Sequence, residues 1–312
     1  MFGNRTVVDM IDRSAENDAD RRTFLRSAGL AGLGALGASA GAGLLGDAAE
    51  AAAPSDGAIL NFALNLEYLE AEFYSQAVFG RGLPSSLTTG KGDRGPVIGG
   101  RQVDFSSKKI RLYAKEIAGD ERNHVQFLRS ALGSAKVSRP TINIKASFTA
   151  AARAAGLVGP RQEFDPYANE NNFLLAAFIF EDVGVTAYKG AAPLIRNKAY
   201  LEAAAGILAT EAYHAATVRT SLFDKGLQDP ARKISAARDK LDGPMERDAG
   251  IGWPNLANIV PTNKKGVVRS RNAARVLNIV YLTPKKANKG GFFPRGVNGP
   301  VHTSMGPGRL AD

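Results

Sequence analysis

The chain has 312 residues, 44% hydrophobic and 22% charged, a composition typical of a globular protein with one sizeable domain and extensions. It contains no cysteine, which excludes disulfides, zinc–thiolate sites, iron–sulfur clusters and thiol nucleophiles, so any metal must bind oxygen and nitrogen donors. The net charge is +10, but the basic residues are scattered without an aromatic-interleaved cluster, which argues against nucleic-acid binding.

The first 53 residues are predicted to be an export signal. Residues 20–26 read Asp-Arg-Arg-Thr-Phe-Leu-Arg and resemble the twin-arginine consensus; an Ala/Gly/Leu run and a small-x-small cleavage site at 49–51 follow. A membrane anchor is the alternative, although the run is short and rich in Gly and Ala for that role. Twin-arginine export carries folded proteins, often with a cofactor already inserted, so the resemblance implies a periplasmic, cell-envelope or extracellular protein.

Cleavage after the signal would remove five basic and seven acidic residues and raise the net charge to +12. A basic exported protein can associate with an anionic envelope surface. A solvated surface without such a partner is the alternative.

The first predicted helix runs from a cap at Ser55 or Asp56 to Phe79, and Gly80 ends it. Glu67 lies in the middle of its apolar stripe. Residues 80–105 are rich in Gly, Ser and Thr and are predicted to be a long loop.

The second predicted helix begins near Ser106 or Ser107 and ends at Gly133, with Glu121 and His124 within its apolar stripe. Residues 134–168 are expected to cross over the bundle, with a short helix at 148–155.

The third predicted helix runs from about Asn169 to Tyr188, with Glu181 on its apolar face. The fourth runs from about Lys198 to Lys225, before Gly226, with Glu211 and His214 on its apolar face. All the acidic and imidazole side chains singled out so far therefore lie on faces that should be buried.

The character of the chain changes from Leu227 onward. Short helices are expected at 233–241 and 274–282, followed by an aromatic, Gly-rich segment at 290–299. Because this part retains Trp and Phe, we expect it to pack on the bundle. The predicted organisation is a signal at 1–53, a four-helix bundle at 54–226 and an extension at 227–312.

Two motifs of the form Glu-x-x-His carry the chemistry: Glu121 with His124, and Glu211 with His214. Positions i and i+3 share a helix face about 4.5 Å apart along the axis, so each pair can bind one cation. Glu67 and Glu181 precede these motifs, and each is followed seven residues later by a tyrosine, Tyr74 or Tyr188. The order Glu…Tyr followed by Glu-x-x-His therefore occurs twice along the chain.

One Glu from each of two helices and Glu-x-x-His from each of two others resembles the ligand set of ferritin-like di-iron and di-manganese proteins. The expected fold is therefore all-α, a ferritin-like four-helix bundle with a long crossover and an irregular C-terminal extension. The predicted metal ligands are Glu67, Glu121, His124, Glu181, Glu211 and His214.

Four carboxylates bring a charge of −4 into an apolar interior, which two divalent cations would neutralise. Oxygen donors with imidazole suit iron or manganese, with zinc as a competitor. Two trivalent ions would need an additional oxo or hydroxo bridge.

Several alternatives remain open from the sequence. A buried Glu can pair with Arg122 or Arg219 instead of a metal, and Glu70 competes with Glu67 for the place on the first helix. The two tyrosines can be core residues, hydrogen-bond donors to the site or radical sites. His302 has no carboxylate three residues before it and is expected to be exposed.

In bacterioferritin-like and rubrerythrin-like bundles, an Asp at the position of Asp120 supports the histidine of the other motif, which here would be His214. The matching position before Glu211 is Thr210, which departs from that pattern. His124 is therefore expected to lack a carboxylate partner, and the two metal sites to differ.

A broader likeness rests on residues 61–74, 276–282 and 291–299, which resemble the ferritin-like desiccation-related (stress-induced) protein family. The likeness covers most of residues 55–300. It implies a ferritin-like fold and a link to dehydration or oxidative stress, without an established reaction.

The leading functional hypothesis is an exported protein with a dinuclear iron or manganese centre that reacts with oxygen or peroxide. The alternative is a non-enzymatic protective or envelope protein with a structural or vestigial metal site. A third hypothesis, an iron-storage cage, is disfavoured by the long loop at 80–105 and the extension. A homo-oligomer is left open, and no protein group is predicted to act as a nucleophile.

Overall fold

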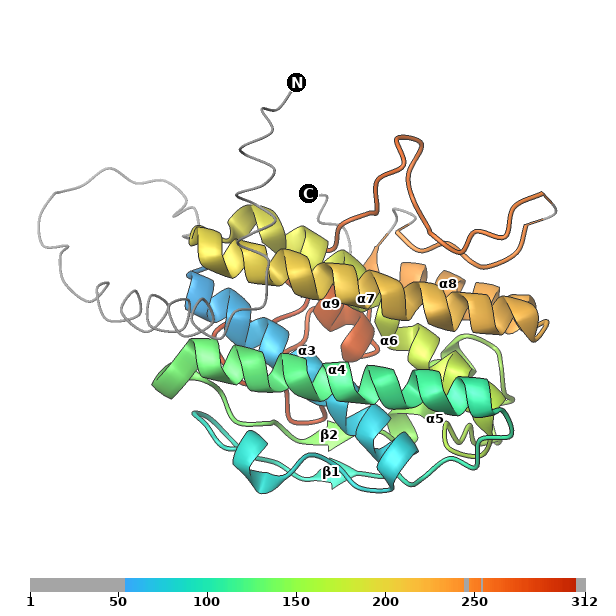
Figure 1. Cartoon of the computed structure of the whole chain (residues 1–312), viewed down its shortest axis with the longest axis horizontal. Coiled ribbons are helices and arrows are strands. Elements are labelled where there is room, and N and C mark those ends of the chain that lie inside the picture. The colour runs from blue at the N-terminus through green and yellow to red at the C-terminus, as the bar shows by residue number, and fades with distance from the viewer. Residues whose placement is uncertain (1–53, 244–246, 254, 307–312) are drawn as a thin grey trace, which may run out of the picture.

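The computed structural model describes residues 54–243, 247–253 and 255–306, so the predicted signal lies outside the described residues. Long helices form the body of the molecule, with shorter elements and loops around them (Figure 1). Among the described helices, none combines the length and the apolar character that crossing a membrane requires.

Four long helices confirm the predicted bundle: α3 (Asp56–Phe79), α4 (Lys108–Leu132), α6 (Glu170–Ala191) and α7 (Lys198–Asp224). Each begins after a polar side chain that accepts a hydrogen bond from a first-turn N–H. These caps are Ser55, Ser107, Asn169 and Asn197. Gly80 ends α3 at φ 65°, a conformation that glycine adopts without strain. The third helix continues beyond its predicted end at Tyr188.

The helices pair as two hairpins, α3 with α4 and α6 with α7; α3 also packs against α6, and α4 against α7. Helices α3 and α6 are buried on nearly every side, because apolar residues occur all round both helices. Helix α4 buries only one stripe and exposes its charged residues. The seam between α4 and α7 therefore lies at the surface of the bundle (Figure 1).

The connections between the long helices contain two strands that the sequence did not predict and one short helix that it did. Two short strands, β1 (Val97–Ile98) and β2 (Ile142–Asn143), pair in parallel within the predicted loop and the crossover. Strands of this length carry no alternation of apolar and polar residues, so periodicity could not detect them. Helix α5 (Ala146–Ala154) confirms the short helix expected at 148–155.

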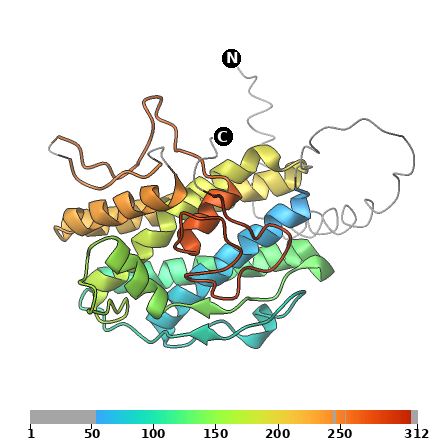
Figure 2. The ribbon, with the colours of Figure 1, turned by 180° about the vertical axis from the view of Figure 1, so that it is seen from behind.

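The C-terminal part adds α8 (Gln228–Asp242) and α9 (Ala273–Val280). Helix α8 begins before the predicted residue 233, because Pro230 in its first turn is tolerated there. Phe292 is fully buried, with its ring centroid 5.0 Å from that of Phe148 and 4.9 Å from that of Phe180. Figure 2 shows α9 and the chain after it lying across the bundle on the face away from α4 and α7.

A buried network of three aspartates and three arginines joins this part to the bundle. Asp182 of α6 accepts hydrogen bonds from Arg219 (2.8 Å) and Arg238 (2.9 Å). Arg238 also pairs with Asp248 at 2.6 Å. Arg271 pairs with Asp242 at 2.8 Å and with Asp248. In this network, named here the Arg–Asp network, each buried charge has an opposite charge beside it.

Candidate metal centre

The four long helices bring all six predicted ligands to one place in the bundle. Each of the six side chains is nearly or fully buried: Glu67, Glu121, His124, Glu181, Glu211 and His214. The two imidazole rings lie 6.3 Å apart between their centroids. The i, i+3 spacing of both Glu-x-x-His motifs thus places carboxylate and ring on the inner face of α4 and of α7.

A first group of donor atoms comes from Glu67, Glu121, His124 and Glu211, whose ligand atoms all lie within 4.8 Å of one another. Nδ1 of His124 is 3.2 Å from Oε2 of Glu67, 3.6 Å from Oε2 of Glu121 and 3.5 Å from Oε1 of Glu211. One ring nitrogen therefore faces three carboxylates from three different helices.

A second group comes from Glu181, Glu211 and His214, again within 4.8 Å. Nδ1 of His214 lies 3.8 Å from Oε2 of Glu181 and 3.1 Å from Oε1 of Glu121. Glu211 belongs to both groups, and Glu121 reaches both histidines with its two oxygens. Glu121 and Glu211 therefore lie between the two groups of donor atoms.

Most of these donor atoms have no hydrogen-bond partner among the described residues. The unpaired atoms are both oxygens of Glu121, both oxygens of Glu211, Oε2 of Glu181 and Nδ1 of His214. Nδ1 of His214 lies 3.1 Å from Oε1 of Glu121, but the geometry is not that of a hydrogen bond. Buried polar atoms without partners are costly, so a set that converges on one point fits a bound cation.

The protonation of the cluster follows from burial and crowding. Burial, with a contribution from Glu121, raises the pKa of Glu67 to about 7 against the opposing effect of His124. Burial likewise raises the pKa of Glu181 to about 8 and that of Glu211 well above its usual range. The protein alone therefore holds these groups in part as neutral acids, and a cation must displace protons to bind.

Neighbouring carboxylates raise the pKa of both histidines, although burial acts to lower it. Burial acts to lower the pKa of His124, but Glu67 and Glu121 raise it to about 11. Burial also opposes the charge on His214, whose pKa Asp120 and Glu121 raise to about 10. Burial acts to raise the pKa of Glu121, but the two histidines hold it below its usual range. Without metal, the two rings are thus the only positive charges inside the cluster among the described residues.

The two tyrosines act across the bundle and not along their own helices. Tyr188 of α6 donates a hydrogen bond to Oε1 of Glu67 on α3, and Tyr74 of α3 donates to Oε1 of Glu181 on α6. Each bond fixes one carboxylate oxygen and leaves Oε2 directed at the cluster. The sequence places each tyrosine on the face of its glutamate, but not the exchange between helices.

The predicted asymmetry between the two histidines is present. Asp120 and Nε2 of His214 lie in hydrogen-bonding contact at 3.1 Å, which leaves Nδ1 toward the cluster. Thr210, at the matching position of α7, donates to the carbonyl of Gly206 in its own helix at 3.2 Å. Among the described residues, no carboxylate contacts Nε2 of His124. The two histidines therefore differ, because a carboxylate outside the cluster contacts His214 and not His124.

Glu70 is a fifth buried carboxylate beside the cluster. Neither group of donor atoms includes it, so Glu67 and not Glu70 takes the place on α3. Its Oε2 has no hydrogen-bond partner. Burial raises the pKa of Glu70 well above its usual range, and the neighbouring carboxylates of Glu121, Glu181 and Glu67 raise it further. Burial and these carboxylates thus favour the protonated form of Glu70.

Gly184 makes room for these carboxylates, and the sequence analysis missed it. A Cβ at this position of α6 would lie 2.5 Å from Oε2 of Glu211 and 3.7 Å from Oε1 of Glu70. A glycine inside a buried helix costs about 1 kcal/mol relative to alanine. Its position one turn after Glu181 is a signal that a close approach was needed.

The alternatives based on arginine do not apply. Arg219 binds Asp182 of the Arg–Asp network, and Arg122 is exposed to solvent. His302 is exposed, as expected, and its Nδ1 lies 3.1 Å from the carbonyl oxygen of Gly299.

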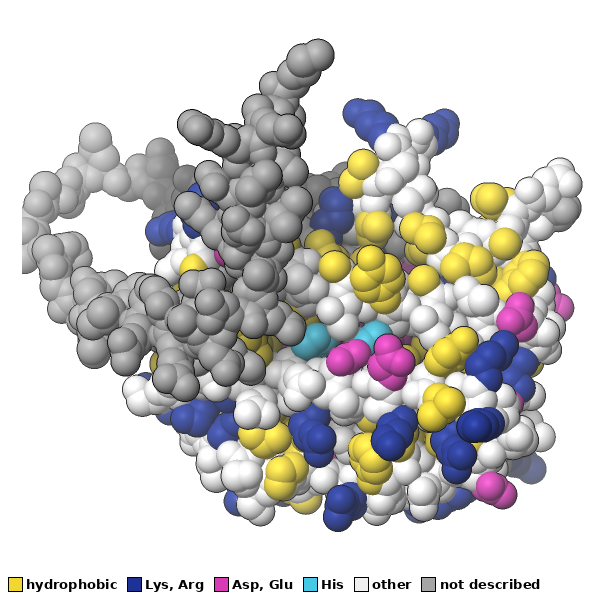
Figure 3. Space-filling model, in the orientation of Figure 1, with side chains coloured by type: hydrophobic (Ala, Val, Ile, Leu, Met, Phe, Trp, Pro, Cys, Tyr) yellow, Lys and Arg dark blue, Asp and Glu magenta, His cyan; other side chains and the backbone are white. Residues whose placement is uncertain are grey.

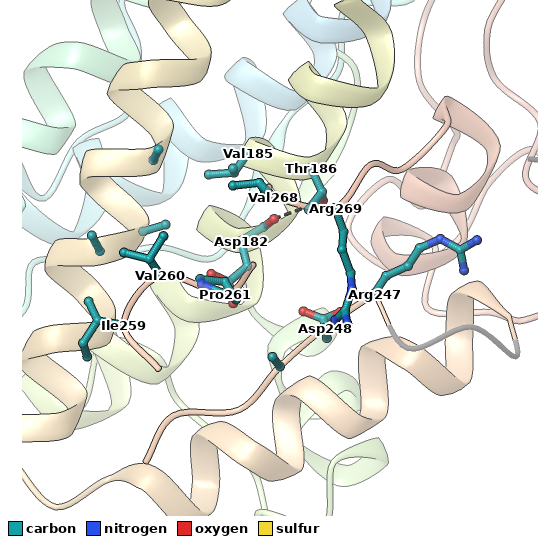
Figure 4. Close-up of a pocket in the computed structure, with 14 residues that line it drawn as sticks. Asp182, Val185, Thr186, Arg247, Asp248, Ile259, Val260, Pro261, Val268 and Arg269 are labelled. Atoms are coloured by element: carbon teal, nitrogen blue, oxygen red, sulfur yellow. Dashed lines mark hydrogen bonds between the residues drawn. The ribbon is translucent and has the colours of Figure 1, made fainter. Parts of the chain in front are cut away.

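The cluster is separate from a small cavity of about 40 Å³ between α6, α7 and the C-terminal part. Figure 4 shows Asp182, Val185 and Asp248 among its lining residues, and none of the six predicted ligands lines it. The cluster instead approaches solvent at the α4–α7 seam, where histidine and acidic side chains are visible in Figure 3.

Comparison with known proteins gives consistent results. The model of the family described as "Ferritin-like domain" matches residues 55–224. The chain is 31% identical over 265 residues to the desiccation-related protein PCC13-62 of Craterostigma plantagineum, covering 78% of this chain and 83% of that protein. It is 27% identical over 268 residues to the ferritin-like catalase Nec2 of Nesocodon mauritianus, with the same coverage of both chains. No solved structure matches the chain significantly.

Proposed function

Because the chain belongs to the ferritin-like domain family, we propose that its bundle holds a dinuclear iron or manganese centre that reacts with peroxide or oxygen. The first ion would bind Glu67 and His124, the second would bind Glu181 and His214, and Glu121 and Glu211 would be shared. The observation that carries the proposal is the convergence of buried, unpaired donor atoms from four helices.

Peroxide disproportionation is the reaction that the chain supports best. In this reaction two molecules of hydrogen peroxide give two of water and one of oxygen, so no outside reductant is needed. The cysteine-free sequence carries no rubredoxin-type electron donor, which disfavours an oxidase that needs electrons at every turnover. A relative named ferritin-like catalase supports the same choice. When bound, the metal pair would supply the two-electron redox chemistry.

The residues of the chain would hold the site and its protons. Tyr188 and Tyr74 fix the outer oxygens of Glu67 and Glu181, and Asp120 orients His214. Glu70, with an unpaired Oε2 and a raised pKa, can keep a proton beside the reacting molecule. Burial of the cluster under α4 and α7 limits the entry of water.

A role in protection against oxidative or drying stress would fit such a reaction. The relative named a desiccation-related protein supports it. We also propose that residues 1–53 direct export, so that the protein works outside the cytoplasm. An Arg21→Lys, Arg22→Lys double variant should then stay in the cytoplasm, and equal export of variant and native chain would contradict this part.

The function is tested by adding hydrogen peroxide to protein loaded with iron or with manganese and measuring released oxygen. We expect one oxygen for every two peroxides consumed, and loss of this activity in a Glu121→Ala, Glu211→Ala double variant. The matched control is Glu116→Ala, Glu202→Ala, which removes two exposed carboxylates from the same two helices.

Full metal loading without oxygen release, with either metal, would reject the catalase reaction. It would favour the alternative of a protective protein whose metal is structural. Equal oxygen release by the double variant and its control would show that the reaction occurs elsewhere.

A further inference from the structure

A projecting loop, formed by residues 249–253 and 255–269, displays large apolar side chains to solvent. Trp253 is 52% exposed, Leu256 61%, Val260 62% and Val267 45%. The loop extends from the same side of the bundle in Figures 1 and 2. Trp253 is also the only tryptophan of the whole sequence. An exposed cluster of this kind usually marks an interaction site.

The base of the projecting loop is held firmly. The buried side chain of Arg219 donates hydrogen bonds to the carbonyls of Ala249 (3.0 Å), Gly250 (2.9 Å) and Asn258. The side chain of Asn258 donates to the carbonyl of Gly250 at 2.7 Å. A bridge between Thr262 and Val268 closes the second turn of the loop. The apolar tips are therefore displayed by a fixed scaffold.

The charge of the projecting loop has one sign. Residues 249–272 contain no Asp or Glu, and Lys264 and Lys265 are exposed at the second turn. Figure 3 shows basic and hydrophobic side chains together on the segments above the bundle. A partner must therefore accept apolar tips and present negative charge beside them.

We propose that the projecting loop docks the protein onto an anionic lipid membrane. Trp253, Leu256, Val260 and Val267 enter the interface between headgroups and acyl chains, and the two lysines contact lipid phosphates. Tryptophan is one of the two side chains enriched at this interface. Four side chains on two turns are few beside the roughly 20–30 residues per partner of a standard protein interface. The docking does not depend on the metal centre.

The test uses the purified protein and lipid vesicles of two compositions, phosphatidylcholine alone and an equal mixture with phosphatidylglycerol. Because Trp253 is the only tryptophan, its fluorescence reports the loop directly. We expect a blue shift and co-sedimentation with the anionic vesicles only, both weakened by added salt. Lys264→Glu, Lys265→Glu should weaken binding by about tenfold or more.

Two matched controls separate the loop from general surface properties. Lys285→Glu, Lys286→Glu makes the same charge change at another exposed pair, and Leu112→Ser, Tyr113→Ser removes exposed apolar groups from α4. Both controls should bind like the native protein, whereas Leu256→Ser, Val260→Ser should lose the blue shift. An unchanged tryptophan spectrum with anionic vesicles would overturn the proposal. Equal binding to both compositions, or a blue shift caused by self-association without lipid, would also overturn it.

Discussion

Two buried clusters of charge lie on neighbouring parts of α6, and the chain balances them differently. In the Arg–Asp network, Asp182 meets Arg219 and Arg238, and each carboxylate has a guanidinium within hydrogen-bonding distance. In the metal cluster, Glu181 and four more glutamates share the interior with two histidines and no arginine or lysine contact among the described residues. The first cluster is neutral by itself, and the second needs protons or cations from outside.

Burial alone therefore does not define a functional site. Buried charges are stable when they are paired, and an arginine fork does this for an aspartate at a structural junction. A carboxylate cluster without such partners remains unsatisfied until something binds. Adjacent residues Glu181 and Asp182 thus belong to opposite kinds of site.

The largest loss of stability is expected from a substitution in the Arg–Asp network. Asp182→Ala leaves two buried guanidinium groups short of their counter-charge, which should lower the free energy of unfolding by about 3–5 kcal/mol. Chemical denaturation measures this change. Asp224→Ala, which removes an exposed carboxylate paired with Lys109 at 3.5 Å, is the control and should have little effect. A small effect of Asp182→Ala would remove the contrast between the clusters.

A substitution in the metal cluster should change the stabilisation by metal and not the stability of the metal-free protein. Burial and the neighbouring carboxylates favour the protonated form of Glu211 without metal, so Glu211→Gln should leave the stability of the metal-free protein nearly unchanged. It should remove most of the stabilisation by metal, about 2.7 kcal/mol at a metal concentration near 100 times Kd. Thermal unfolding with and without Mn²⁺ measures both. Strong destabilisation of the metal-free variant would show that Glu211 has a structural role.

The metal cluster should make the stability of the metal-free protein depend on pH. The pKa of Glu67 is raised to about 7 and that of Glu181 to about 8, so from pH 4.5 upward the folded metal-free protein binds more protons than the unfolded chain. Its stability should therefore fall as the pH rises through these values. The raised pKa values of His124 and His214 act in the same direction above pH 6.5.

Metal binding should reverse this trend, because the donors must lose their protons to bind. The increase in melting temperature caused by Mn²⁺ should grow between about pH 5 and pH 8. A metal-induced increase that shrinks with rising pH would contradict the assigned donors. The Glu211→Gln protein is the control and should show little increase at any pH.

The smallest expected effect concerns the space beside the carboxylates. Gly184→Ala should add up to about 1 kcal/mol of helix stability to the metal-free protein. Its Cβ would displace Oε2 of Glu211, so metal affinity should fall by about tenfold or more. Gly206→Ala on α7, where a Cβ meets nothing within 4 Å, is the matched control for helix stability. Calorimetric titration with metal compares the affinities of the two variants, and equal affinities would refute the role of Gly184.

Much of the fold could be predicted from the sequence because the four long helices carry strong local signals. Caps such as Ser107 and Asn169 and the period of the apolar residues set the helix ends to within a few residues. The two-residue strands β1 and β2 could not be predicted, because their pairing joins segments far apart in the chain.

The candidate site was predictable to the same degree. The i, i+3 motifs and the faces of Glu67 and Glu181 identified the six residues that converge. The exchange of Tyr74 and Tyr188 between helices, and the space beside Gly184, depend on how α3, α6 and α7 pack against each other. No local pattern in one helix contains that information.

We propose that cations balance the glutamate cluster as arginines balance the Arg–Asp network. Elemental analysis of the folded protein, after loading with iron or manganese and removal of free metal, tests it most directly. We expect two ions per chain in the native protein and in the Glu116→Ala, Glu202→Ala control, and almost none in Glu121→Ala, Glu211→Ala. Equal metal content in all three proteins, or none in the native protein, would contradict it.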